Sequence, residues 1–216
     1  NLGSTETVHV KFVMVLCQDG KKLATREGNA VALQEVIDEA VRRATDVVRS
    51  KNTELPPDRV SQISSTVAIG ALKYNDLRQH PYSDITFDWD AMLDLGGNSG
   101  PYLQYTYARL ASILAKADHS DDAHHQLTHP AERVLMRHLL DFGHTVTQCA
   151  RVYALNGLAL YLYELAEKAN RYYEQVRILE DADAGRKVAR LYLISVVATT
   201  IKKGLELLGI QALERI

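Results

Sequence analysis

The chain has few cysteines and no strong charge bias. Among its 216 residues only Cys17 and Cys149 are cysteines, far apart and outside any metal-ligand or redox spacing. They exclude a disulfide framework and indicate the buried thiols of an intracellular protein. A net charge of -2, from 25 basic and 27 acidic side chains, gives no overall basic signature, so any RNA site has to be local.

Long apolar runs are also missing. The longest, LALYLY at 158–163 and LYLISVVA at 191–198, are far shorter than the roughly 18 residues that span a bilayer. The first residues lack the order of a secretory signal. We therefore expect a cytoplasmic protein with no membrane partner. The content of 46% hydrophobic and 24% charged residues is typical of a folded globular chain.

Most of the chain carries helical periodicity, with apolar residues recurring at steps of three and four. These stretches cover residues 33–48, 58–74, 101–117, 130–146, 158–176 and 188–208. Asp58 is expected to cap the second helix, and Gly209 to end the last. The acidic stretch 80–100 is too apolar for a linker and predicts an ordered loop.

Residues 8–16 instead alternate as a strand does, and Asp19-Gly20 predicts a tight turn. The rest of the sequence offers no obvious partner for this strand, and one strand alone is not stable. We therefore predict a mainly α fold: an antiparallel helical bundle preceded by a small strand and loop piece. The expected division is 1–57 and 58–216.

Tyrosines gather at the start of the helix predicted from Pro101. At about 100° per residue, Tyr107 lies on the apolar face, whereas Tyr102 and Tyr105 share another stripe with Arg109. Periodicity alone favours rings that cover a neighbouring helix with their hydroxyls in water. The alternative is a surface on which unpaired RNA bases stack. The glycine-rich run 96–100, which contains Asn98, would let a nucleotide approach the backbone closely.

Two other groups of side chains are weaker candidates. Four histidines lie close together in the sequence, namely His119, His124, His125 and His129. They could hold zinc, but nothing supplies ligands of a second shell, so we predict no metal site. Three aspartates, Asp88, Asp90 and Asp94, are expected to cap and flank a short helix rather than bind magnesium.

Residues 67–117 resemble arginyl-tRNA synthetase where its catalytic domain passes into its anticodon-binding domain. The most specific parts are FDWD (87–90) and GNSGPYLQYTYAR (97–109). Further segments resemble the carboxy-terminal helical domain of that family, often called the DALR domain. They are HPAER (129–133), residues 161–179 and residues 190–216.

Residues 9–29 resemble the KMSKS loop of class I synthetases, which closes over the ATP triphosphate. Here the loop reads Lys22-Leu23-Ala24-Thr25-Arg26, with Ala24 and Thr25 where the general motif has Ser and Lys. The resemblance implies that Lys22 and Arg26 stabilise charge developing on pyrophosphate and that Lys22, Thr25 and Arg26 bind ATP.

The family reaction joins arginine to tRNA-Arg through an arginyl-adenylate, with ATP and Mg²⁺. The resemblance implies that Tyr105 and Arg109 meet the anticodon loop, with Tyr102 and Asn98 as neighbours. The closing residue of the family, commonly Met, also approaches the anticodon, and Ile216 stands there. The resemblance to this family implies no DNA partner.

The HIGH-type motif and the ATP-binding Rossmann halves are missing from these residues. This chain alone is therefore expected to bind no cofactor and to aminoacylate nothing. Two alternatives remain: a catalytically silent relative that binds tRNA, and a helical scaffold for protein partners. Asn170 and Tyr173, in the ANRYY segment, match a family pattern and are expected to be structural first.

Overall fold

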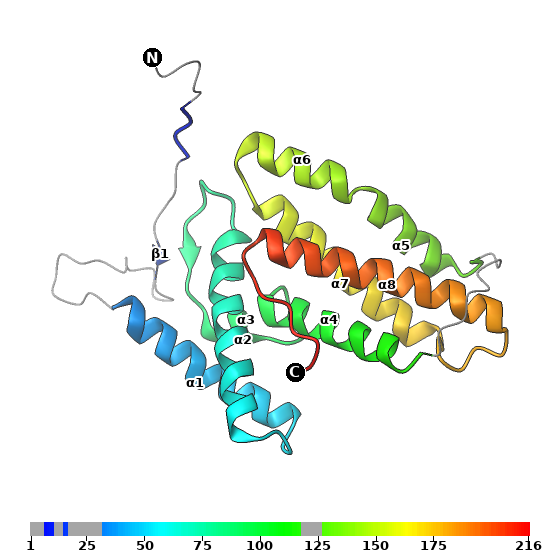
Figure 1. The fold of residues 1–216 in the computed structure, drawn as a ribbon. Helices are drawn as coiled ribbons and strands as arrows, with labels where there is room; N and C mark the ends of the chain where they lie inside the picture. The colour runs from blue at the N-terminus through cyan, green and yellow to red at the C-terminus, as the bar shows by residue number, and fades with distance from the viewer. Residues whose placement is uncertain (1–6, 11–14, 17–31, 118–126) are drawn as a thin grey trace, which may run out of the picture.

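A computed structural model of the protein describes residues 7–10, 15–16, 32–117 and 127–216 (Figure 1). The elements in chain order are β1 (Val15–Leu16), α1 (Leu33–Lys51), α2 (Pro57–Leu77), β2 (Ile85–Thr86), α3 (Trp89–Leu93), α4 (Gly100–Ala115), α5 (Pro130–Leu140), α6 (Phe142–Val152), α7 (Asn156–Gln175) and α8 (Ala184–Leu207). The mainly α prediction is confirmed, because long helices dominate this part of the chain.

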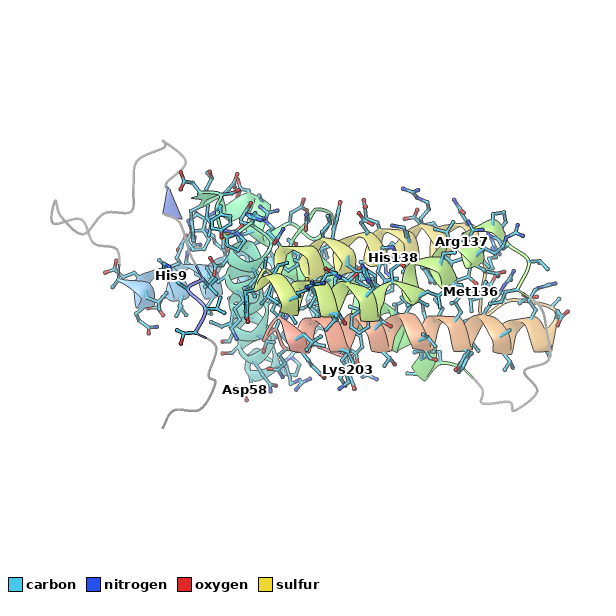
Figure 2. All side chains as sticks on the ribbon, turned by 90° about the horizontal axis from the view of Figure 1, so that it is seen from above. His9, Asp58, Met136, Arg137, His138 and Lys203 are labelled. Atoms are coloured by element: carbon cyan, nitrogen blue, oxygen red, sulfur yellow. The ribbon has the colours of Figure 1, made fainter. Side chains whose placement is uncertain are left out.

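The helical bundle is built around α4, α7 and α8. Helix α4 packs against α2, α7 and α8, while α5 and α6 cover α7. Seen from above, the bundle extends away from α1 and α2 (Figure 2). Its core consists of fully buried aliphatic and tyrosine side chains, among them Leu103, Leu110, Leu135, Leu158, Leu162, Leu165, Tyr172, Ile194 and Ile201. Each such aliphatic side chain contributes about 1.5–3 kcal/mol through removal from water.

A second apolar cluster lies between α1, α2 and α3. Ala40, Ala44 and Val48 form a buried stripe on α1 at steps of four, facing Ile63 and Val67 of α2. The two alanines leave room for α2 to approach α1 closely. The apolar periodicity of both helices is therefore explained by one shared interface.

The strand expected over residues 8–16 can be checked only at residues 8–10 and 15–16, because residues 11–14 lie outside the described residues. Residues 7–10 are irregular, and β1 pairs in parallel with β2, with Val15 opposite Ile85 and Leu16 opposite Thr86. The prediction that the chain offers no partner was wrong. Strand β2 is two residues long, and two residues cannot display a period-two pattern that the sequence would reveal.

Two helix boundaries also differ from the predictions. The stretch 130–146 is divided at Asp141 into α5 and α6. Helix α2 begins at Pro57 and not after an Asp58 cap, because proline is preorganised for the first helical position. Gly209 follows α8 with φ of +67°, as its predicted role at the helix end requires.

The far end of the bundle holds a buried ion-pair network. Glu132 is fully buried, and its Oε1 accepts from Arg190 Nε at 2.7 Å and from the Tyr172 hydroxyl at 3.2 Å. Arg190 also donates to Asp181 at 2.5 Å, and Arg186 donates to the same carboxylate at 2.7 Å. The network joins α5, α7, α8 and the segment between α7 and α8.

No helix within the described ranges is both long and apolar enough to cross a membrane.

Candidate nucleic-acid interface

The loop that leads into α4 is fixed by side chains from α2 and from its C-terminal cap, Arg78. The Tyr74 hydroxyl donates to Asn98 Oδ1 at 2.6 Å, and Arg78 donates to the Asn98 carbonyl at 2.8 Å. Ser99 then caps α4 by accepting from the Tyr102 amide at 3.1 Å. The Asn98 side chain therefore sets the direction in which α4 begins.

Tyr105 and Arg109 lie one turn apart on α4 and form a joint surface feature. The Arg109 guanidinium carbon is 5.0 Å from the centre of the Tyr105 ring, and Arg109 also donates to the Tyr105 hydroxyl at 3.5 Å. Both side chains are partly exposed. The sequence interpretation that places them on one stripe is therefore confirmed by the geometry. Such a ring and cation pair is worth about 0.5–1 kcal/mol at an exposed position.

Asn170 on α7 holds Arg109 in place. Its Oδ1 accepts from Arg109 at 3.1 Å, while its Nδ2 donates to the Tyr102 hydroxyl and to Thr106 Oγ1, both at 3.0 Å. The side-chain amide thus uses both donors and its acceptor. Since Thr106 is fully buried, Asn170 also satisfies a polar group in the core.

Tyr102 does not lie on the outward stripe expected for it. Its ring is only 8% exposed, packs in the main core and lies 5.7 Å from the Tyr163 ring, centre to centre. Helix α7 covers this side of α4, a contact that the periodicity of α4 alone could not reveal. Burial raises the pKa of the Tyr102 hydroxyl above its ordinary value.

Tyr173 lies beside Arg109 as well, although a structural role was expected for it from the sequence. Its ring centre lies 5.9 Å from the Arg109 guanidinium carbon, and the residue is 40% exposed. The guanidinium therefore has a tyrosine ring from α4 and another from α7 within reach. The signal was present in the sequence, because Asn170 and Tyr173 are three residues apart on one helix and so share a face.

The remaining predicted site residues lie apart from this group or outside the described residues. Ile216 is partly buried and packs against the cluster formed by α1, α2 and α3. Lys22, Thr25 and Arg26 lie outside the described residues, so their predicted contacts with ATP stay predictions.

The two weaker groups of side chains have structural roles where they are described. His129 caps α5: its Nδ1 accepts from the Ala131 amide, and its own backbone amide donates to the Glu132 carboxylate. The other three histidines of that group lie outside the described residues. Asp88 caps α3 by accepting from the amides of Asp90 and Ala91, as expected.

Comparison with protein-family models decides the family. Residues 103–216, more than half of the chain, match the model of the DALR anticodon binding domain. The chain belongs to the DALR family. Residues 2–89 match a second model, the catalytic domain of class I (R) tRNA synthetases. Residues 90–102 lie between the two matched segments. The predicted domain boundary between residues 57 and 58 stays a prediction.

Individual relatives of this DALR-family chain are named arginine–tRNA ligases. The arginine–tRNA ligase of Vibrio parahaemolyticus is 43% identical over 215 residues, which cover 98% of this chain and 37% of that protein. The Chloroflexus aurantiacus arginine–tRNA ligase is 40% identical over 215 residues, covering 97% and 38%. The chain thus spans a little over a third of the length of these relatives.

Solved structures agree with the fold. The arginyl-tRNA synthetase of Thermus thermophilus matches with a TM-score of 0.86 and 34% identity, over 95% of this chain and 35% of that one. The Plasmodium falciparum arginyl-tRNA synthetase matches with a TM-score of 0.76 and 30% identity, over 86% and 34%. The described fold is therefore one that arginyl-tRNA synthetases adopt.

Proposed function

We propose that this chain binds the anticodon region of tRNA-Arg as part of an arginine–tRNA ligase, and that Tyr105, Arg109 and Tyr173 form the contact. One observation carries the proposal: the Arg109 guanidinium, held at 3.1 Å by the half-buried Asn170 side-chain amide, lies beside two tyrosine rings at the surface. Unpaired bases stack on aromatic rings and on guanidinium planes.

The arrangement supports RNA binding on energetic grounds. Asn170 holds Arg109 before any ligand arrives, so little side-chain freedom is lost on binding. An arginine carries five N–H donors, and this one uses two nitrogens on Asn170 and Tyr105. The remaining donors can reach phosphate or base acceptors.

We propose in addition that Ile216, Asn98 and Tyr102 contribute indirectly. Asn98 and Tyr102 set the position of α4, while Ile216 lies on the separate cluster near α2. For the ligase as a whole we propose arginine, ATP and Mg²⁺ as reactants and cofactor, with Lys22, Thr25 and Arg26 at the ATP phosphates. The names of the relatives support this activity, and we propose that it takes place in the cytoplasm.

A direct test is titration of fluorescently labelled tRNA-Arg against the chain and against Tyr105→Ala. Loss of one stacked base, worth about 1–3 kcal/mol, should weaken binding roughly 5- to 150-fold. The melting temperature should change little, because the ring is partly exposed. Tyr192→Ala is the matched control, since Tyr192 is a 70% exposed tyrosine on α8 outside this group.

Two results would contradict the assignment of these residues to the contact. A large fall in melting temperature for Tyr105→Ala would show that the ring serves the fold. Equal weakening by Tyr192→Ala would show that binding is not localised at α4 and α7. If the unchanged chain gives no saturable binding at moderate salt, a scaffold for protein partners becomes the better explanation. Arginine-dependent exchange between ATP and pyrophosphate by the whole ligase distinguishes an enzyme from a silent relative.

A further inference from the structure

We propose that Gln104 is a positioning residue that holds residues 209–216, here called the post-α8 segment, against α4. By doing so it fixes the rotation of α4 and keeps Tyr105 and Arg109 aligned for RNA. The second part of this inference rests on the proposed function. The first part, the anchoring of the segment, does not.

The contacts of Gln104 are directed at the post-α8 segment. Its side chain is fully buried, and Nε2 donates to the Gln211 carbonyl at 2.8 Å and, more weakly, to the Thr66 carbonyl at 3.4 Å. Lys73 of α2 donates to the Gly209 carbonyl at 2.6 Å. Helices α2 and α4 therefore both hold the backbone of this segment.

The post-α8 segment spans the two apolar clusters. Ile210 is 2% exposed and belongs to the core of the bundle, whereas Leu213 and Ile216 pack against the cluster of α1, α2 and α3. In Figure 1 the segment runs from the end of α8 beside α2 and in front of α4. Gln104 grips it at Gln211, between its two apolar anchors.

Gln104 is poorly suited to a purely stabilising role. Its buried Oε1 has no hydrogen-bond partner among the described residues. Turning the amide over would place Oε1 against the Gln211 carbonyl oxygen and would lose the hydrogen bond to it. An apolar side chain of similar size would avoid an unpaired buried acceptor. What glutamine adds at this position is the hydrogen bond to the Gln211 carbonyl.

The neighbouring backbone leaves room for this amide. A Cβ at Gly70 would lie 2.8 Å from Gln104 Nε2, and a Cβ at Gly100 would lie 2.5 Å from the Gly70 carbonyl oxygen. Helices α2 and α4 therefore cross closely beside Gln104. Gly70→Ala consequently offers a second way to displace the amide without changing Gln104 itself.

The link to the RNA-binding face is the helix. Gln104 and Tyr105 are adjacent on α4 and so point about 100° apart. A rotation of α4 that breaks the contact with Gln211 also moves Tyr105 and Arg109. The anchored segment thus supports the proposed contact from another face of the same helix.

The test compares Gln104→Met, truncation after Ile210, and both changes together. Gln104→Met should keep or raise the melting temperature and should speed backbone hydrogen exchange at residues 211–216. It should weaken the binding of labelled tRNA-Arg by up to about fivefold, because the free energy of the lost hydrogen bond between Gln104 and Gln211 limits what the displaced helix can cost the RNA contact. Truncation should weaken tRNA binding by at least as much. Adding Gln104→Met to the truncated chain should weaken tRNA binding no further. Gly70→Ala should speed the same exchange.

The control is Gln148→Met on α6, an exposed glutamine, which should change neither exchange nor affinity. Unchanged exchange at 211–216 in Gln104→Met would overturn the anchoring. Losses that add in the double variant would overturn the coupling to RNA, because independent effects add. If the unchanged chain binds no tRNA, the proposed function and the coupling both fail, whereas the exchange data still decide the anchoring.

Discussion

At the scale of single residues, one amide organises the candidate interface. Tyr102, Thr106 and Arg109 lie on one side of α4 at steps of four and three, and Asn170 contacts all three. An amide offers two donors and one acceptor, which matches a hydroxyl, a hydroxyl and a guanidinium. The same residue therefore ties α7 to the core of α4 and holds the exposed cation.

A prediction at this scale concerns the charge of Arg109. If the guanidinium lies at an RNA phosphate, Arg109→Gln should lower the slope of log affinity against log salt by about 0.7 for single-stranded RNA. The measurement is tRNA-Arg affinity at several salt concentrations. Arg151→Gln, which removes one charge from an exposed position on α6, should leave the slope unchanged. Equal slopes for the chain and Arg109→Gln would rule out a phosphate contact.

At the scale of elements, the ends of the helices are held by side chains from other segments. Glu132 joins the first turn of α5 to α7 and α8, and Asp181 joins the segment after α7 to α8 through Arg186 and Arg190. Carboxylates this deeply buried require cations, because an unpaired buried charge is costly. The network thus fixes how α5 and α8 meet.

The corresponding prediction is that Arg190→Met is strongly destabilising. Arg190 contacts both Glu132 and Asp181, whose side chains are 0% and 2% exposed, so its removal leaves Glu132 without its cation. The expected loss is about 3–5 kcal/mol, measured by urea unfolding. Arg177→Met breaks an exposed ion pair with Glu180 and should cost less than about 1 kcal/mol. Similar losses in the two variants would refute a special role for the buried network.

At the scale of the whole molecule, the same ion-pair network makes the stability of the fold depend on pH. The hydrogen bond from Arg186, and in smaller measure the Arg190 charge, lowers the pKa of Asp181 from 3.8 to about 2. The folded chain therefore binds a proton at this carboxylate less readily than the unfolded chain does. The resulting stabilisation is complete above about pH 4 and is lost as the pH falls through about 2.

Asp181→Asn should remove this contribution. The melting temperature of the variant should lie below that of the unchanged chain by a constant amount from pH 7 to about pH 5. The difference should shrink as the pH falls from about 4 towards 2, because the carboxylate of the unchanged chain becomes protonated there. Thermal unfolding at a series of pH values measures it. A gap that stays constant down to pH 2 would mean that Asp181 acts by packing and not by charge.

Much of the fold could be predicted because its signals are local. Helical stripes, proline at helix starts and Gly209 after α8 each depend on a few neighbouring residues. The pair Tyr105 and Arg109 was also predictable as one stripe, because a spacing of four places two side chains on the same face of a helix. The split at Asp141 and the pairing of β1 with β2 could not be predicted, since neither leaves a periodic signal long enough to detect.

The sequence by itself determined where helices form and which side chains share a helix face, because these follow from spacing along the chain. Only the tertiary structure decided which of those faces stayed open. Tyr102 became core and Arg109 stayed at the surface because α7 packs over one and beside the other, through Asn170, 61 positions after Arg109. Contacts between residues so far apart depend on how whole helices pack, and the periodicity of one helix does not record its neighbours.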